Sequence, residues 1–186
     1  MMMDHEFWHE RWSTGQIAFH QTQVNELLTS IWPRLGLANG DLVLVPLCGK
    51  SLDMLWLRAQ GLDVVGVELS EEAVTAFFDE NKIPHDISDR DGFKVFSADC
   101  LTIMCGDFFA LPVAVLQTAR GVYDRGAVIA LPPEMRQRYT AKLKSDLHAS
   151  ARVLIVCVEY DQSEMSGPPF SVSHDEIAAY YEDRFN

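Results

Sequence analysis

The hydrophobic pattern of residues 41–70 predicts a strand, a helix and a second strand in close succession. Residues 41–47 and 63–69 are apolar runs without polar alternation, which is typical of strands buried on both faces of a parallel sheet. Between them, apolar residues recur at helical spacing from Ser51, a good capping residue, to Gly61, which suits the left-handed end of a helix. This order is a βαβ unit, and its crossover should be right-handed.

The rest of the chain continues the alternation of helices and strands. Residues 93–98 and 101–105 resemble a hairpin inserted where a third parallel strand belongs. Ser173 and Glu176 form a capping box for a last helix that should end at Asn186. The pattern also predicts helices at residues 24–31, 70–78 and 132–147, strands at residues 121–126 and 151–160, and a polar connection over residues 81–92. The sequence therefore predicts one α/β domain over residues 1–186, with a doubly wound, mainly parallel sheet and helices on both faces.

Composition and charge narrow the class of protein. The chain has 186 residues and is 48% hydrophobic, which is enough for one domain with a sizeable core. Its 15 basic and 27 acidic residues give a net charge of −12 without a basic stripe, so neither nucleic acid nor an anionic membrane is expected as a partner. Four cysteines without CxxC spacing indicate buried thiols in a reducing compartment, rather than metal ligands or disulfides. No apolar run reaches membrane-spanning length and residues 1–8 do not resemble a signal peptide, so a cytoplasmic location is expected.

The two strand ends of the βαβ unit indicate a nucleoside site. In an open α/β sheet, ligands lie beyond the carboxyl ends of the strands, so the turn at residues 47–50 and the acid Glu68 should face the same crevice. A carboxylate about 20 residues after the first turn commonly binds the hydroxyl groups of a ribose. A dinucleotide site needs three glycines beside a pyrophosphate, and this turn has only Gly49, which disfavours NAD and FAD. The run Gly49-Lys50-Ser51 imitates the end of a P-loop, but Leu44 stands where that motif needs glycine. The expected cofactor is therefore S-adenosylmethionine, a nucleoside without a diphosphate.

An aromatic segment precedes the first strand, and two interpretations of it stay open. Trp8, Trp12 and Phe19 lie in a polar setting. Trp8 and Trp12 are four residues apart on a short helix and can staple the amino terminus to the core. Alternatively, residues 1–21 fold over the crevice as a lid, with ring faces near the sulfonium or the adenine.

Further loops should reach the same crevice. Asp107 can accept the adenine amino group while Phe108 packs on the ring, or the acid can simply cap a helix. Asp124 and Arg125 end a predicted strand, so both should reach the crevice. They form either a solvated ion pair or a site in which Arg125 binds the methionine carboxylate or an anionic substrate through two hydrogen bonds. The stiff loop at residues 167–170 either walls the acceptor pocket or is only a turn.

Several motifs together resemble those of the thiopurine S-methyltransferase family, in its compact prokaryotic form. In chain order they are FWHERW, IAFHQ, VPLCGKSLDMLWL, VVGVELS, VYDRGAVIALP and SGPPFSVSHDEI. The resemblance covers nearly the whole chain. It implies a class I S-adenosylmethionine fold, a cytosolic monomer, and methyl transfer to the sulfur of aromatic and heterocyclic thiols such as 6-mercaptopurine. It also implies that some prokaryotic members methylate selenium and tellurium compounds.

The resemblance also assigns site residues. It implies that Trp12, Leu47, Glu68 and Arg125 bind the cofactor. It further implies that the stretch from Trp8 to Phe19, with Asp107 and Phe108, contacts cofactor or substrate, and this favours the lid over the staple. A heterocyclic thiol is partly thiolate near neutral pH, and the thiolate is the nucleophile. Positioning should therefore supply most of the rate, with Arg125 as the expected catalytic residue that favours the anionic acceptor, and with no obligatory base.

The resemblance implies a longer chain as well. Members of the family usually have two further strands at the sheet edge after the last helix, and this sequence lacks them. Either the sequence is a fragment, or something else covers the strand predicted at residues 151–160. Uncovered, that strand would be an exposed apolar edge, so the isolated chain is predicted to be poorly stable and prone to aggregate or to pair with another copy. Two other functions stay open at this stage. One is an S-adenosylmethionine-binding module without turnover, and the other is a nucleotide-dependent oxidoreductase, which the missing glycines disfavour.

Overall fold

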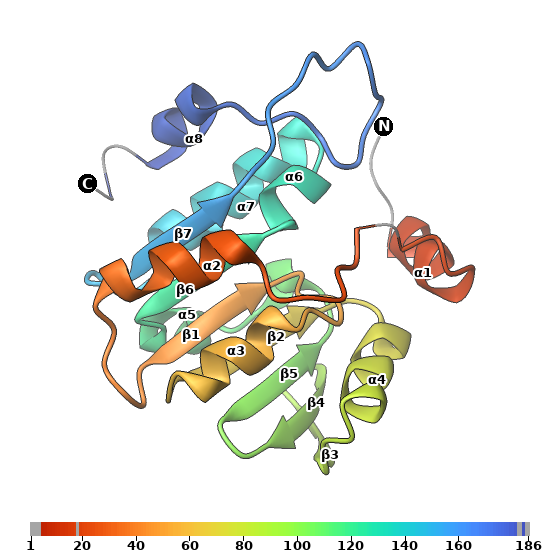
Figure 1. Ribbon diagram of the computed structural model, residues 1–186, viewed down its shortest axis with the longest axis vertical. Coiled ribbons are helices and arrows are strands. Elements are labelled where there is room, and N and C mark those ends of the chain that lie inside the picture. Colours follow the sequence, from red (N-terminus) through yellow and green to blue (C-terminus); the bar gives the residue numbers. More distant parts are fainter. Residues whose placement is uncertain (1–4, 18, 182–183, 185–186) are drawn as a thin grey trace.

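The computed structural model describes residues 5–17, 19–181 and 184, and it contains a seven-stranded sheet with helices on both faces (Figure 1). The strands are β1 (Leu42–Pro46), β2 (Asp63–Glu68), β3 (Asp86–Arg90), β4 (Phe93–Ala98), β5 (Leu101–Cys105), β6 (Gly121–Arg125) and β7 (Arg152–Val156). The helices are α1 (His5–Ser13), α2 (Glu26–Ile31), α3 (Asp53–Ala59), α4 (Glu71–Glu80), α5 (Val113–Thr118), α6 (Ala127–Ala130), α7 (Pro133–Asp146) and α8 (His174–Tyr181), with 3-10 turns η1 (Trp32–Leu35) and η2 (Phe108–Ala110). The strand order is β3-β4-β5-β2-β1-β6-β7, and β5, β2, β1, β6 and β7 run parallel.

The predicted βαβ unit is confirmed as β1, α3 and β2. The two strands pair in parallel from Leu42 opposite Asp63 to Pro46 opposite Val67. Gly61 has φ +82°, the left-handed conformation that ends the preceding helix. The cap predicted at Ser51 is displaced by one residue: Leu52 is the N-cap residue of α3, without a side-chain cap, although the Ser51 hydroxyl accepts the backbone N–H of Asp53 at 3.2 Å. The βαβ unit therefore forms at the residues where the sequence pattern predicts it.

The region between β2 and β5 differs from the prediction by one strand. The hairpin of β4 and β5 is confirmed, and β5 pairs in parallel with β2, so it is the third parallel strand of the sheet. The polar connection predicted at residues 81–92 is wrong in part, because residues 86–90 form β3, antiparallel to β4. All five residues of β3 are exposed, so no apolar face marks the strand in the sequence.

The carboxyl-terminal region is more irregular than predicted. The strand predicted at residues 151–160 ends at Val156. Beyond it the chain pairs with its own returning loop: the backbone N–H of Val172 donates to the Val158 carbonyl at 2.9 Å, and the Ser171 hydroxyl donates to the Tyr160 carbonyl at 2.7 Å. The last helix ends at Tyr181, and its predicted continuation to residue 186 lies largely outside the described residues.

Neighbouring residues of the central strand pack into different layers of core. Leu44 belongs to a cluster beneath α5, α6 and α7, whereas Val43 and Val45 belong to a cluster beneath α2, α3 and α4. All three are almost fully buried, as expected for a parallel sheet covered on both faces. This arrangement confirms the predicted doubly wound α/β fold and leaves the carboxyl ends of the parallel strands as the place for a crevice.

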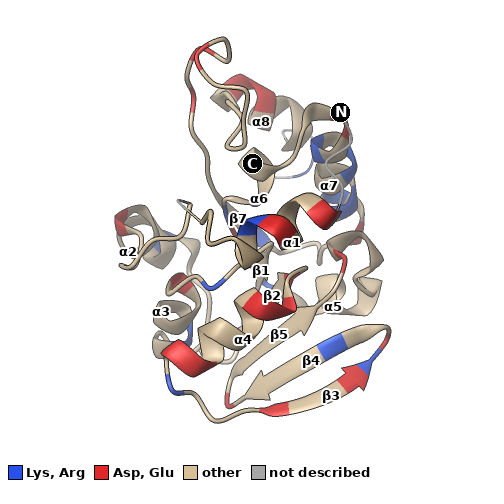
Figure 2. Cartoon of the chain, turned by 90° about the vertical axis from the view of Figure 1, so that its right-hand side faces the viewer, with Lys and Arg blue, Asp and Glu red and all other residues tan. Residues whose placement is uncertain are grey.

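Charge is spread over the surface of the fold. Figure 2 shows acidic residues on α1, α4, α8 and β3, with basic residues interspersed. Within the described part of the chain, no helix is long and apolar enough to cross a membrane.

Candidate functional site

A cavity of about 540 Å³ lies at the carboxyl ends of the five parallel strands. Its walls include residues 47–51 after β1, 67–69 at the end of β2, 106–109 after β5, 125–126 at the end of β6, and the end of β7. The volume falls in the range of small-molecule sites. All eight residues predicted to bind the cofactor line it: Trp8, Trp12, Phe19, Leu47, Glu68, Asp107, Phe108 and Arg125. The fold thus brings together residues that are up to 117 positions apart in sequence, from Trp8 to Arg125.

Glu68 occupies the centre of the strand ends. Its side chain is buried, and its two carboxylate oxygens accept the backbone N–H groups of Gly49 and Ser70, each at 2.8 Å. Burial raises the pKa of this carboxyl group, and the hydrogen bonds from Ser70 and Gly49 oppose the rise. A carboxylate can accept about four hydrogen bonds, so roughly two acceptor positions are left for hydroxyl donors in the cavity.

The turn after β1 has an unusual backbone. Leu47 has φ +48° and Gly49 has φ +53°, both in the left-handed region. For leucine this conformation costs on the order of 1–2 kcal/mol, and residues held in it concentrate at functional sites. The turn also brings Gly49 against an aromatic ring, because a Cβ atom at this position would lie 3.1 Å from Cζ2 of Trp12. The glycine therefore permits both the turn and the close approach of Trp12.

The amino-terminal rings form one cluster at the cavity. Trp12 is 7% exposed, and its ring lies edge-on to Phe19 with 5.4 Å between centroids. Trp8 meets Phe19 in the same way at 5.8 Å, and Phe19 itself is 42% exposed. Trp12 is thus anchored against the turn after β1, while Phe19 presents its ring to solvent beside the cavity. The buried Trp12 fits the staple interpretation, and the lid stays a prediction.

Asp107 and Phe108 follow β5 directly. The Asp107 carboxylate accepts the backbone N–H of Phe109 at 2.9 Å, so the capping interpretation is confirmed for the short turn η2. The side chain also lines the cavity, so capping and facing the site go together. Phe108 is 4% exposed and its ring lies 5.0 Å from that of Tyr139 on α7, which fixes its orientation.

Asp124 and Arg125 separate at the end of β6. The prediction that both reach the crevice is wrong for Asp124, which is fully buried away from it and accepts the Tyr139 hydroxyl at 2.7 Å and the backbone N–H groups of Ala127 and Val128 at 3.1 Å. Burial raises the pKa of Asp124 to about 6. Arg125 lines the cavity, and within the described part of the chain its guanidinium forms no ion pair with a carboxylate.

Sequence reasoning missed several residues of the site. Arg11 lines the cavity one helical turn after Trp8, with its guanidinium 4.7 Å from the Phe7 ring centroid. The spacing of Trp8 and Arg11 on α1 is a signal that could have found it. The missed residues on the β6 and β7 side are Ile129, Ala130, Leu131, Met135, Val156 and Val158. These have no local signal, because their place depends on long-range packing. The loop predicted as a wall does contribute, through Pro168 and Pro169.

The chemistry of these residues fits a nucleoside with a cationic centre. A buried acid with spare acceptor positions suits vicinal hydroxyl groups, and flat aromatic side chains suit a purine. The turn after β1 has one glycine and no phosphate-binding loop, so a diphosphate has no cradle there. Among the described residues, no group of three or more His, Cys, Asp or Glu side chains could hold a metal ion.

Comparison with known sequences places this chain beside one family. The family profile described as thiopurine S-methyltransferase matches residues 3–186. The thiopurine S-methyltransferase of Azotobacter vinelandii is 52% identical over 175 residues, which cover 94% of this chain and 80% of that protein. The thiopurine S-methyltransferase of Pseudomonas entomophila is 53% identical over 177 residues, which cover 95% of this chain and 82% of that protein.

Solved structures with a similar fold include methyltransferases. The 1,6-didemethyltoxoflavin-N1-methyltransferase of Burkholderia thailandensis, with S-adenosylhomocysteine bound, has a TM-score of 0.65 at 17% identity and covers 97% of this chain and 75% of that chain. The phosphoethanolamine N-methyltransferase 2 of Haemonchus contortus, in complex with S-adenosyl-L-methionine, has a TM-score of 0.65 at 14% identity. The match covers 97% of this chain and 41% of that chain. At such identities the likeness concerns the fold, and it confirms the predicted class I methyltransferase architecture.

Proposed function

This chain belongs to the thiopurine S-methyltransferase family, and we propose that it methylates the sulfur of aromatic and heterocyclic thiols such as thiopurines. It is an S-adenosylmethionine-dependent methyltransferase. The observation that carries the thiol proposal is one cavity with two chemical halves. A buried acid and aromatic rings lie on the β2 and β5 side, and an arginine with an apolar wall lies on the β6 and β7 side.

The first half is proposed to hold the cofactor. Glu68 would accept the ribose hydroxyl groups, while Asp107 and Phe108 would meet the adenine. Trp12 and Leu47 would line the turn that the cofactor crosses. When bound, S-adenosylmethionine supplies a methyl group on an already activated sulfonium, so this chain's residues need only hold, orient and shield the reacting groups.

The second half is proposed to hold the acceptor. Arg125 would favour the thiolate form by its charge, because no carboxylate among the described residues neutralises it. Ile129, Leu131 and Pro168 give this side an apolar wall, which suits a flat heterocycle and excludes water. Glu68 and Asp107 already accept backbone N–H groups, and the reaction needs no base when the acceptor arrives as thiolate.

The amino-terminal segment is proposed to act as the lid of a single domain. Trp8 and Phe19 border the cavity, and α1 reaches the body of the protein through Trp12. Closure over bound ligands would bring the ring faces toward the sulfonium, where cation–π attraction is worth about 0.5–2 kcal/mol.

The test is methyl transfer from labelled S-adenosylmethionine to a panel of acceptors. A thiopurine and a simple aromatic thiol should be methylated at sulfur, and the oxygen analogue of the same heterocycle should not. Selenite and tellurite, which the resemblance to prokaryotic members also implies, belong in the same panel. Titration of tryptophan fluorescence should show binding of S-adenosylmethionine and none of NAD. A folded protein that binds S-adenosylmethionine and methylates no thiol would refute the proposal.

A further inference from the structure

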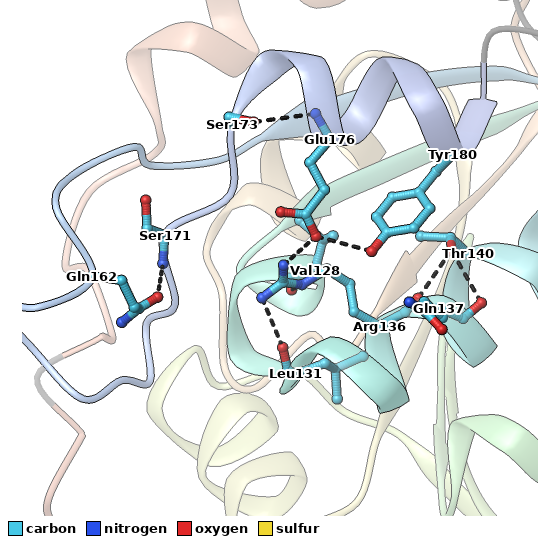
Figure 3. A network of polar contacts seen from close by, with 10 residues as sticks. All are labelled: Val128, Leu131, Arg136, Gln137, Thr140, Gln162, Ser171, Ser173, Glu176 and Tyr180. Carbon is cyan, nitrogen blue, oxygen red and sulfur yellow. Dashed lines mark hydrogen bonds and ion pairs between the residues drawn. The ribbon is translucent and has the colours of Figure 1, made fainter.

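The acceptor side of the cavity rests on a short helix whose end needs outside support. Helix α6 has four residues, so its last carbonyl groups have no intrahelical donors. The Arg136 side chain supplies two donors for this end of the helix: Nε donates to the Val128 carbonyl and Nη2 donates to the Leu131 carbonyl, each at 3.2 Å (Figure 3). The Ile129 carbonyl accepts the backbone N–H of Phe170 at 2.6 Å. Arg136 thus caps the end of α6 from α7.

The same guanidinium joins α7 to α8. Arg136 is 2% exposed, and its Nη1 forms an ion pair with Oε1 of Glu176 in the first turn of α8. Glu176 is fixed in turn, because its backbone N–H donates to the Ser173 hydroxyl at 3.1 Å and the Tyr180 hydroxyl donates to Oε1 at 2.9 Å (Figure 3). A buried charge is tolerated when it is paired and hydrogen-bonded, and Arg136 has an ion pair and one hydrogen bond from each of its three side-chain nitrogens.

These contacts reach the cavity through two segments that line it. One segment is the end of α6 with the residue after it, Ile129, Ala130 and Leu131. The other is the strap that connects β7 to α8, which contains Pro168 and Pro169. We infer that Arg136, held by Glu176, is a positioning residue that sets the shape of the acceptor half. It touches neither ligand in this arrangement, since it is absent from the cavity lining. The inference rests on the proposed function, because that function assigns this half to the acceptor.

A positioning role and a merely structural role make different predictions. If Arg136 only stabilised the fold, its loss would weaken the cofactor and acceptor halves together. If it positions the acceptor wall, its loss should raise the acceptor KM and leave the cofactor Kd unchanged, because among the described residues Glu68 and the turn after β1 share no hydrogen bond with this network.

The experiment compares wild type with Glu176→Gln, Arg136→Lys and the control Arg58→Lys. Gln keeps the size of Glu176 but removes its charge, and Lys reaches fewer of the acceptors that Arg136 serves. Arg58 lies on α3 outside the cavity and meets Asp99 only at 3.9 Å, with the Asp99 side chain 90% exposed. We expect the thiopurine KM to rise about tenfold or more in the first two variants, as for loss of a charge-assisted hydrogen bond, with the cofactor Kd unchanged. Arg58→Lys should match wild type in both.

A second readout does not depend on turnover. Hydrogen exchange at the Phe170 amide, which bonds to Ile129, should speed up in Glu176→Gln, while the amides of β1 and β2 should keep their protection. Unchanged exchange at Phe170 in a folded Glu176→Gln variant would overturn the inference, as would a rise in cofactor Kd parallel to that in KM. If wild type methylates no thiol, the proposed function fails, and the exchange result still decides whether Arg136 and Glu176 hold the wall.

Discussion

Replacement of Glu68 by Gln tests the nucleoside end of the site. In the wild type, one charged carboxylate accepts two backbone N–H groups at 2.8 Å, from Gly49 and from Ser70. Gln can accept only one of them, because its amide nitrogen is itself a donor. The unsatisfied N–H costs about 1–3 kcal/mol. Removal of a buried charge offsets part of this cost, since burial raises the pKa of Glu68 and so disfavours its charged form. The free energy of unfolding of the ligand-free variant should therefore change little.

The cofactor should respond more strongly than the fold. A hydrogen bond to a charged group contributes about 1.5–3 kcal/mol, so loss of the carboxylate should raise the Kd of S-adenosylmethionine by roughly 10- to 150-fold. Calorimetric titration of S-adenosylmethionine and S-adenosylhomocysteine measures this. Both ligands should weaken equally, because they share the ribose. Glu71→Gln is a matched control, since Glu71 is 55% exposed on α4 and pairs with Lys94 outside the cavity. A folded Glu68→Gln variant with the wild-type Kd would refute the placement of the sugar.

Three further substitutions test other parts of the site. Arg125→Ala should lower kcat/KM for a thiopurine about 10- to 100-fold, as expected for loss of a charge-assisted contact, and wild-type turnover in the variant would remove the proposed role. Gly49→Ala should destabilise the fold by about 1 kcal/mol, because φ is +53° and the new Cβ meets the Trp12 ring at 3.1 Å, and it should weaken the cofactor; urea unfolding and titration measure the two effects. Asp124→Asn should flatten the dependence of stability on pH. The raised pKa, about 6, means that the stability contributed by protonated Asp124 is fully present below its unfolded pKa near 4 and is lost as the pH rises through 6. Between these values wild type should lose on the order of 3 kcal/mol more than the variant, and equal slopes in urea unfolding across this window would contradict the assignment.

The local hydrophobic pattern was sufficient to predict the strands that are buried on both faces of the sheet. The strands β1 and β2 have apolar central residues without polar alternation, so their positions, their parallel pairing and the shared crevice with Glu68 could all be predicted. Strand β3 could not be predicted, because all of its residues are exposed and no hydrophobic alternation marks it. Only its antiparallel pairing with β4 in the folded structure reveals it. The end of β7 was misplaced for a related reason: residues after Val156 are apolar but pair with the loop at residues 171–172 instead of the sheet.

The separation of Asp124 from Arg125 shows the same limit at the site itself. The sequence presents them as neighbouring opposite charges at a strand end, which is ordinarily a solvated pair. Alternation along β6 sends consecutive side chains to opposite faces, and Tyr139, fifteen residues later, provides the buried hydroxyl that Asp124 accepts. The acid is thereby kept away from the arginine. Only the folded arrangement of α7 over β6 reveals this.

The consequence for catalysis is electrostatic. A chain with net charge −12 would be expected to repel a thiolate, and two acids, Glu68 and Asp107, border the cavity, where backbone N–H groups hydrogen-bond to their carboxylates. Glu68 accepts the backbone N–H groups of Gly49 and Ser70, and Asp107 accepts that of Phe109, whereas Arg125 has no carboxylate partner among the described residues. An anion bound on the β6 and β7 side would therefore lie beside a positive charge that has no carboxylate partner among the described residues. In a cavity with apolar walls such a charge acts at lower dielectric than at the surface, so its effect on the thiol pKa should survive salt that screens the exterior. Measuring the pH dependence of kcat/KM at low and at high ionic strength checks this: an apparent acceptor pKa that shifts with salt as much as a surface group does would mean that Arg125 is not shielded by the wall.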